Sequence, residues 1–173
     1  LGDRAGLCRG WRLVVSPRPT KGVAMISMHL LLGLNLFSTL AMVGLIWFVQ
    51  IVHYPMFRHV GEDSFLDYVR LHQRLATSVV APFMLVEAFT AVGLLYRLPE
   101  SIPASWLWGG VALVFVIWLS TAILQVPRHG ALTENGFSAT HHSTLVATNW
   151  LRTAAWTARG VLMTTIVCRL IPS

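Results

Sequence analysis

The sequence predicts an all-α integral membrane protein, folded as a four-helix up-down-up-down bundle. The first observation is a set of long runs with few ionisable side chains. Residues 30–51 and 101–126 contain none, and residues 75–95 contain only Glu87. Each run reaches the roughly 20 residues that an α-helix needs to cross about 30 Å of hydrocarbon. The second observation is composition, since 55% of the 173 residues are hydrophobic, which leaves little chain for a separate soluble domain.

Four spans are predicted, over residues 29–52, 64–95, 105–126 and 142–168. Pro55 is expected to end the first, because proline disfavours helix in the residue before it. Pro127 is expected to end the third, with a polar loop over 127–140. Pro82 lies inside the second span, where a kink is expected. Short connections between the spans favour antiparallel neighbours, with both termini on one side of the membrane.

The fourth span contains two arginines, Arg152 and Arg159. On insertion scales a central arginine costs about 2.5–3.5 kcal/mol. Neighbouring helices offset that cost if they supply polar partners. The fourth span is therefore predicted from the bundle as a whole rather than from its own hydropathy.

Residues 1–24 are predicted to form a basic N-terminal arm, distinct from a transmembrane domain over 25–173. Its charges fit an arm that sets topology or touches anionic lipid. The alternative is that translation starts at Met25 or Met28. The predicted orientation of the bundle in the membrane depends on which residue starts the translated chain. We expect a multi-pass protein of the plasma or inner membrane, whose partners are the lipid bilayer and a hydrophobic small molecule, and not nucleic acid.

Chain order brings many polar side chains to one end of the bundle. The first and third spans end there, and the second and fourth begin there. The residues expected at this end are Gln50, His53, Tyr54, His72, Arg74, Gln125, His129, His141 and His142. Polar side chains inside a membrane are expensive, so such a cluster indicates a functional site.

A second polar group is predicted deeper in the bundle. There, Glu87 is expected to pair with Arg152 or Arg159, with Asn35 at a similar depth. Asn149 shares the polar stripe of the fourth span, at helical spacing from both arginines. One acid for two arginines leaves surplus positive charge, which suits an anionic or phenolate-like ligand. The alternative is a structural ion pair that fixes helix register, with Asn149 bonding between helices.

No specific metal motif is present, and the cofactor is left open. The candidate metal ligands are three histidines, His53, His72 and His129. A haem held by His53 and His72 from neighbouring helices is one alternative.

Three short motifs resemble a known family. They are Val52-His53-Tyr54-Pro55, Gln125-Val126-Pro127-Arg128-His129 and Asn149-Trp150-Leu151-Arg152-Thr153. Together they are similar to the anthrone-oxygenase-like family of small four-helix membrane proteins, over about residues 30–170. Some members of that family are linked to the oxygenation of anthrones to anthraquinones without an evident cofactor. The resemblance implies His53 as the base that removes a ring proton and Arg152 as the group that stabilises the phenolate.

Three functions follow as hypotheses. The first is a cofactor-free oxygenase or oxidoreductase acting on a hydrophobic aromatic or quinone-like substrate. The second is a non-enzymatic membrane protein, such as a transport subunit or assembly factor, whose polar side chains are structural. The third is a haem- or metal-binding redox subunit. The polar side chains are predicted to line one shared seam: Asn35, Gln50, Tyr54, His72, Glu87, Gln125, Asn149 and Arg159.

Overall fold

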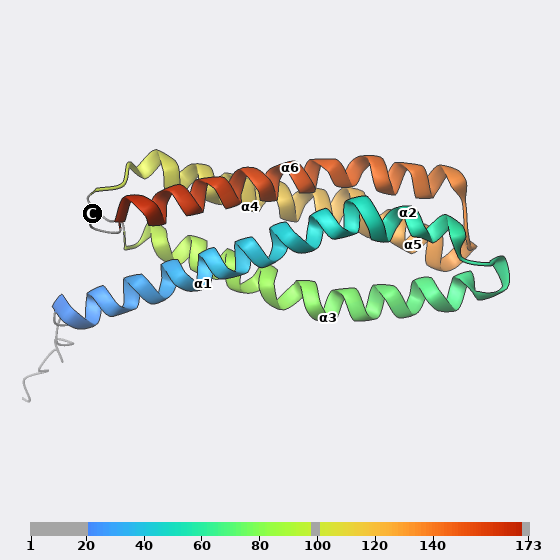
Figure 1. Ribbon diagram of the computed structural model, residues 1–173, viewed down its shortest axis with the longest axis horizontal. Helices are drawn as coiled ribbons and strands as arrows, with labels where there is room; N and C mark the ends of the chain where they lie inside the picture. Colours follow the sequence, from blue (N-terminus) through green and yellow to red (C-terminus); the bar gives the residue numbers. More distant parts are fainter. Residues whose placement is uncertain (1–20, 98–100, 171–173) are drawn as a thin grey trace, which may run out of the picture.

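The computed structural model is an elongated bundle of four antiparallel helical limbs (Figure 1). It describes residues 21–97 and 101–170, with side chains from residue 28 onward, and these ranges contain no strand. The first limb joins α1 (Lys21–Phe48), η1 (Val49–His53), α2 (Tyr54–Met56) and η2 (Phe57–His59). The second is α3 (Glu62–Leu95). The third joins α4 (Ala104–Ser120), η3 (Thr121–Gln125) and α5 (Val126–Asn135), and the fourth is α6 (Ala139–Leu170).

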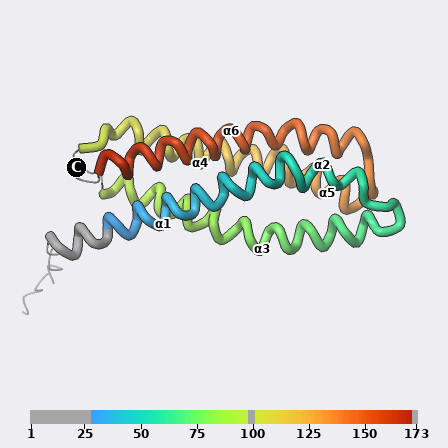
Figure 2. Tube along the Cα trace, viewed as in Figure 1, coloured from blue at the N-terminus to red at the C-terminus, as the bar shows by residue number. Residues whose placement is uncertain are grey.

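The limbs alternate in direction, as the short connections predict. In the ribbon and tube views, α1 begins and α6 ends at the same end of the bundle (Figures 1 and 2). The opposite end carries the connections from η2 to α3 and from α5 to α6. We call it the loop end. The predicted all-α fold and up-down order are thus confirmed.

Three limbs are long and apolar enough to cross a membrane. They cover Met28–His59, Glu62–Tyr96 and Ala104–Asn135. α6 is long enough, with 32 residues, but polar side chains such as Asn149, Arg152 and Arg159 lower its hydropathy. Its exposed surface is nevertheless apolar in places, at Trp150, Leu151 and Val161, whereas both arginines are buried.

Two predicted helix ends are wrong, because neither Pro55 nor Pro127 stops its limb. Each proline follows a π-helical turn, η1 in the first limb and η3 in the third. The Tyr54 N–H bonds to the Val49 carbonyl, and the Val126 N–H bonds to the Thr121 carbonyl, both five residues back. A wider turn gives the proline ring room that a regular α-helix denies it, so the helix continues.

The predicted polar loop over 127–140 is also largely helical. α5 continues to Asn135 and ends at Gly136, whose φ of 79° lies in the left-handed region that suits glycine. α3 begins at Glu62, two residues before the predicted start, with Glu62 and Asp63 in its first turn. Pro82 lies inside α3, and the helix is continuous through it.

Most of the predicted N-terminal arm, residues 1–20, lies outside the described residues. The helix of the first limb begins at Lys21, earlier than the span predicted from residue 29. The predicted end of the fourth span at 168 falls within α6, which continues to Leu170.

Three apolar clusters hold the limbs together along the bundle axis. The cluster nearest the termini includes Leu94 and Ile166, and the middle one includes Met42 and Trp156. The cluster at the loop end is centred on Phe57, which is fully buried. The polar side chains described below lie among these clusters.

Candidate functional site

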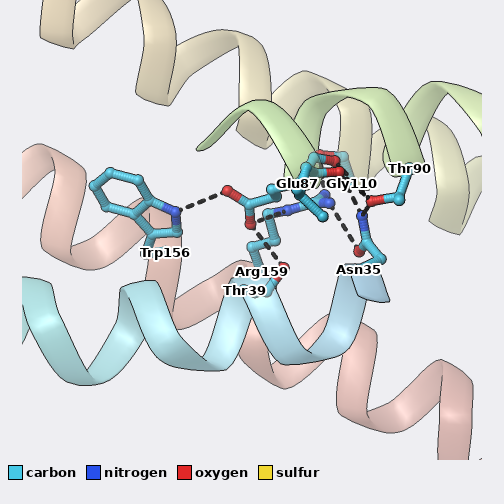
Figure 3. Close-up of polar contacts among 8 residues, drawn as sticks. Asn35, Thr39, Glu87, Thr90, Gly110, Trp156 and Arg159 are labelled. Atoms are coloured by element: carbon cyan, nitrogen blue, oxygen red, sulfur yellow. Dashed lines mark hydrogen bonds and ion pairs between the residues drawn. The ribbon is translucent and has the colours of Figure 1, made fainter. Parts of the chain in front are cut away.

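The polar side chains separate into two networks, and Arg152, predicted deeper in the bundle beside Glu87, lies in the one at the loop end. The mid-bundle network consists of Asn35, Thr39, Glu87, Thr90, Trp156 and Arg159 (Figure 3). The loop-end network consists of Gln50, His53, Tyr54, His72, Gln125, His129, Asn149 and Arg152. The loop-end network draws on all four limbs, and the mid-bundle network draws on three, with the Gly110 carbonyl of the third limb as a further acceptor.

Arg159 is the centre of the mid-bundle network and is almost fully buried. Its Nε donates to Glu87 Oε1 at 2.7 Å, forming an ion pair. Its Nη1 donates to the Gly110 carbonyl at 2.6 Å, and its Nη2 donates to Asn35 Oδ1 at 3.0 Å. All three guanidinium nitrogens therefore have acceptors, from three different limbs (Figure 3).

Glu87 is equally well satisfied. Thr39 Oγ1 donates to Oε1 at 2.7 Å, and Trp156 Nε1 donates to Oε2 at 3.0 Å. The Asn35 amide, in turn, donates to the Glu87 carbonyl and to Thr90 Oγ1. Every charged group here is neutralised and hydrogen-bonded, as a buried ion pair requires.

Arg152 contrasts sharply with Arg159. It is only 6% exposed, yet no carboxylate of the described residues lies within ion-pair distance. Its Nη1 donates to Asn149 Oδ1 at 3.3 Å, its guanidinium lies 5.1 Å from the centroid of the Trp156 ring, and its Nε has no described hydrogen-bond partner. It also lies beside the Tyr54 hydroxyl, and among the described residues it is a buried cation without a carboxylate counterion.

Two hydrogen-bonded pairs, one of two histidines and one of a tyrosine with a histidine, lie at the loop end. His53 Nε2 and His72 Nδ1 share a hydrogen bond of 2.8 Å, and the Tyr54 hydroxyl and His129 Nε2 share one of 2.9 Å. Tyr54 is buried, whereas His53 and His72 are partly exposed. The aromatic ring of Phe57 packs against both pairs.

Two glutamines from the π-helical turns complete the network. Gln50 Oε1 accepts from Asn149 Nδ2 at 2.8 Å, and Gln50 Nε2 donates to the Val146 carbonyl. Gln125 Nε2 donates to Thr148 Oγ1 at 3.0 Å, and its Oε1 is buried without a described partner. Both π-turns therefore direct an amide against α6.

The structure does not give the loop-end network the geometry of a haem site. Metal–imidazole distances of about 2.0 Å separate two axial nitrogens by about 4 Å. His53 and His72 are instead bonded directly to each other at 2.8 Å. Within residues 21–97 and 101–170, no group of three or more His, Cys, Asp or Glu side chains is arranged to hold a metal ion.

The predicted site residues thus divide between the two networks. Asn35, Glu87 and Arg159 lie mid-bundle, and the others lie at the loop end. His142 lies beside the latter and bonds to the Tyr54 carbonyl at 2.7 Å, whereas His141 is exposed. Sequence reasoning missed Thr39 and Thr90, although each lies three or four residues from a predicted site residue, on the same helix face.

Comparison with protein-family models, curated proteins and solved structures finds no match for this chain.

Proposed function

We propose that this chain is a multi-pass membrane protein that binds a hydrophobic aromatic molecule able to ionise, and oxidises it at the loop-end network without a cofactor. The observation that carries this proposal is Arg152, a buried cation with no carboxylate partner among the described residues. A ligand that becomes a phenolate or enolate supplies the missing negative charge. It would also accept a hydrogen bond from Arg152 Nε.

The membrane part of the proposal rests on the exterior of the bundle. Three limbs have the length and hydropathy to cross a bilayer. α6 turns Arg152 and Arg159 inward and exposes Val161, which is 64% exposed. A fourth span of this kind fits the rule that intramembrane charges face the bundle interior.

The chemistry that fits this arrangement starts with proton removal. In an anthrone-type substrate, His53 would take a proton from the ring methylene, aided by its bond to His72. Arg152 would stabilise the resulting anion. Molecular oxygen is the co-reactant: the methylene carbon loses four electrons, one oxygen atom becomes the new carbonyl, and the other leaves as water. The reaction balances without a further reductant. The family resemblance supports the same roles.

The test is oxygen consumption and quinone formation from anthrone by the protein purified in mild detergent. We expect His53→Ala and Arg152→Lys to lower turnover at least about a hundredfold, the lower range for a general base or an anion-stabilising group. Lysine keeps the charge but loses the planar fork. His59→Ala and Arg169→Lys are matched controls, since both residues are exposed and lie outside the network. Equal turnover in the His53→Ala variant and wild type would refute the proposal.

A second function, a non-enzymatic membrane protein with a structural seam, is favoured by the mid-bundle network. Every polar group around Glu87 and Arg159 is satisfied within the chain.

A visible spectrum with elemental analysis tests the third hypothesis, a haem- or metal-binding redox subunit. A Soret band, or a stoichiometric metal that His53→Ala removes, would establish a redox subunit instead.

A further inference from the structure

An open groove on the surface between α3 and α5 contains polar side chains that belong to neither network. It is lined by Arg70, Gln73, Arg74, Thr77, Thr133 and Glu134. Arg70 Nη2 donates to the Thr133 carbonyl at 3.3 Å, which ties the two walls of the groove together.

The α3 wall of this groove is a stripe of hydrogen-bond donors. Residues 70, 73, 74 and 77 follow the i, i+3, i+4, i+7 spacing of one helix face. Both arginines are exposed, and in the described part of the chain neither forms an ion pair, although Glu134 borders the same groove. The groove therefore offers two positive charges and further donors against one acid.

The position of the groove along α3 places it at the membrane surface. α3 has 34 residues, about 51 Å at 1.5 Å per residue, which exceeds the roughly 30 Å hydrocarbon thickness. Arg74 is the last charged residue before the apolar run over 75–95, in which Glu87 is the only ionisable side chain. The arginines thus lie where hydrocarbon gives way to headgroups.

We propose that this groove binds the phosphate of an anionic phospholipid. Arginine matches phosphate oxygens with paired N–H donors, and Thr77 and Gln73 supply further donors beside them. A membrane phospholipid has its phosphate at this depth, beside the two arginines, which is why we choose it as the occupant. The site is independent of the loop-end network and of any reaction there.

The test is native mass spectrometry of the detergent-purified protein with phosphatidylglycerol and with phosphatidylcholine. We expect each arginine that holds the phosphate at the membrane surface to contribute about five- to sixfold to anionic lipid affinity. We therefore expect Arg70→Gln with Arg74→Gln to weaken phosphatidylglycerol binding about thirtyfold. The control, Arg58→Gln with Arg97→Gln, removes the same charge from exposed positions outside the groove, and should change binding less than about threefold.

Three outcomes would overturn the proposal. They are equal loss in the groove variant and the control, equal retention of the two lipids by wild type, and displacement of phosphatidylglycerol by millimolar glycerol phosphate. The last would indicate a site for soluble phosphates. If the double variant fails to fold, Thr77→Val should give a smaller loss of phosphatidylglycerol binding in the same direction, and unchanged binding would count against the groove.

Discussion

The two polar networks are built from the same four limbs and each contains one buried arginine, but only one network is complete. Arg159 meets a carboxylate, an amide oxygen and a backbone carbonyl. Arg152, seven residues earlier in the same helix, meets one amide oxygen, an aromatic face and the Tyr54 hydroxyl. A complete network of buried charges fixes the register of helices, whereas an incomplete one leaves free energy available for a ligand. The contrast is the basis on which we propose a structural role for the middle of the bundle and a ligand site at the loop end.

The largest expected effect comes from breaking the complete network. Glu87→Gln would leave the Arg159 guanidinium buried without its counterion, and we expect it to lower the free energy of unfolding by about 3–5 kcal/mol. Reversible unfolding in mixed micelles, followed by circular dichroism, measures this. Glu134→Gln removes an exposed acid and is the control. Adding Arg159→Met should restore most of the loss, and failure to do so would show that the pair is not coupled.

A smaller effect is expected where Arg159 meets backbone. A Cβ at Gly110 would lie 3.0 Å from Arg159 Nη1, so Gly110→Ala should push the guanidinium off its carbonyl acceptor. We expect a loss of about 1–3 kcal/mol in the same unfolding assay. The neighbouring Gly109 has open space around its Cβ position. There, alanine should stabilise the helix by about 0.5–1 kcal/mol, and a loss at Gly109 equal to that at Gly110 would argue against steric displacement.

The smallest stability effect is expected at the incomplete network. Arg152→Met would remove an unpaired buried charge whose insertion costs about 2.5–3.5 kcal/mol. It would also lose the Asn149 bond and the contact with Trp156, which together contribute about 1–2 kcal/mol. The free energy of unfolding should therefore rise by about 0.5–2.5 kcal/mol. A loss comparable to that in Glu87→Gln would show that Arg152 is structural too.

The sequence was sufficient for the fold and for the convergence of polar side chains at the loop end, because both follow from hydropathy and chain order, but it placed Arg152 with the deeper residues. It was not sufficient to choose the partner of Glu87. Arg152 and Arg159 are seven residues apart, so they differ by only about 20° around the helix and mainly in depth. Depth depends on the register between α3 and α6, which packing of buried residues such as Met84 and Trp156 determines.

The prolines were misread for a related reason. A proline in sequence signals a missing N–H and a steric clash, but not how the preceding turn relieves the clash. In this chain η1 and η3 relieve it by widening, so both limbs continue past their prolines to His59 and Asn135. The first and third predicted spans, which end at residues 52 and 126, therefore stop too early.

The two π-helical turns are also the places in the helical limbs where the chain can lose a residue with the least change in register. Each turn holds one more residue than an α-helical turn would, and deleting a residue within 49–53 or 121–125 would allow the helix to close regularly. The regular turn would rotate the chain by nearly the same total angle, so Tyr54 and His129 would still face the bundle interior, whereas a deletion in regular α-helix rotates everything beyond it by about 100°. Single-codon deletions at these two places should therefore be tolerated better than deletions in the middle of α1 or α4, and a deletion scan of the gene would reveal both turns as paired maxima.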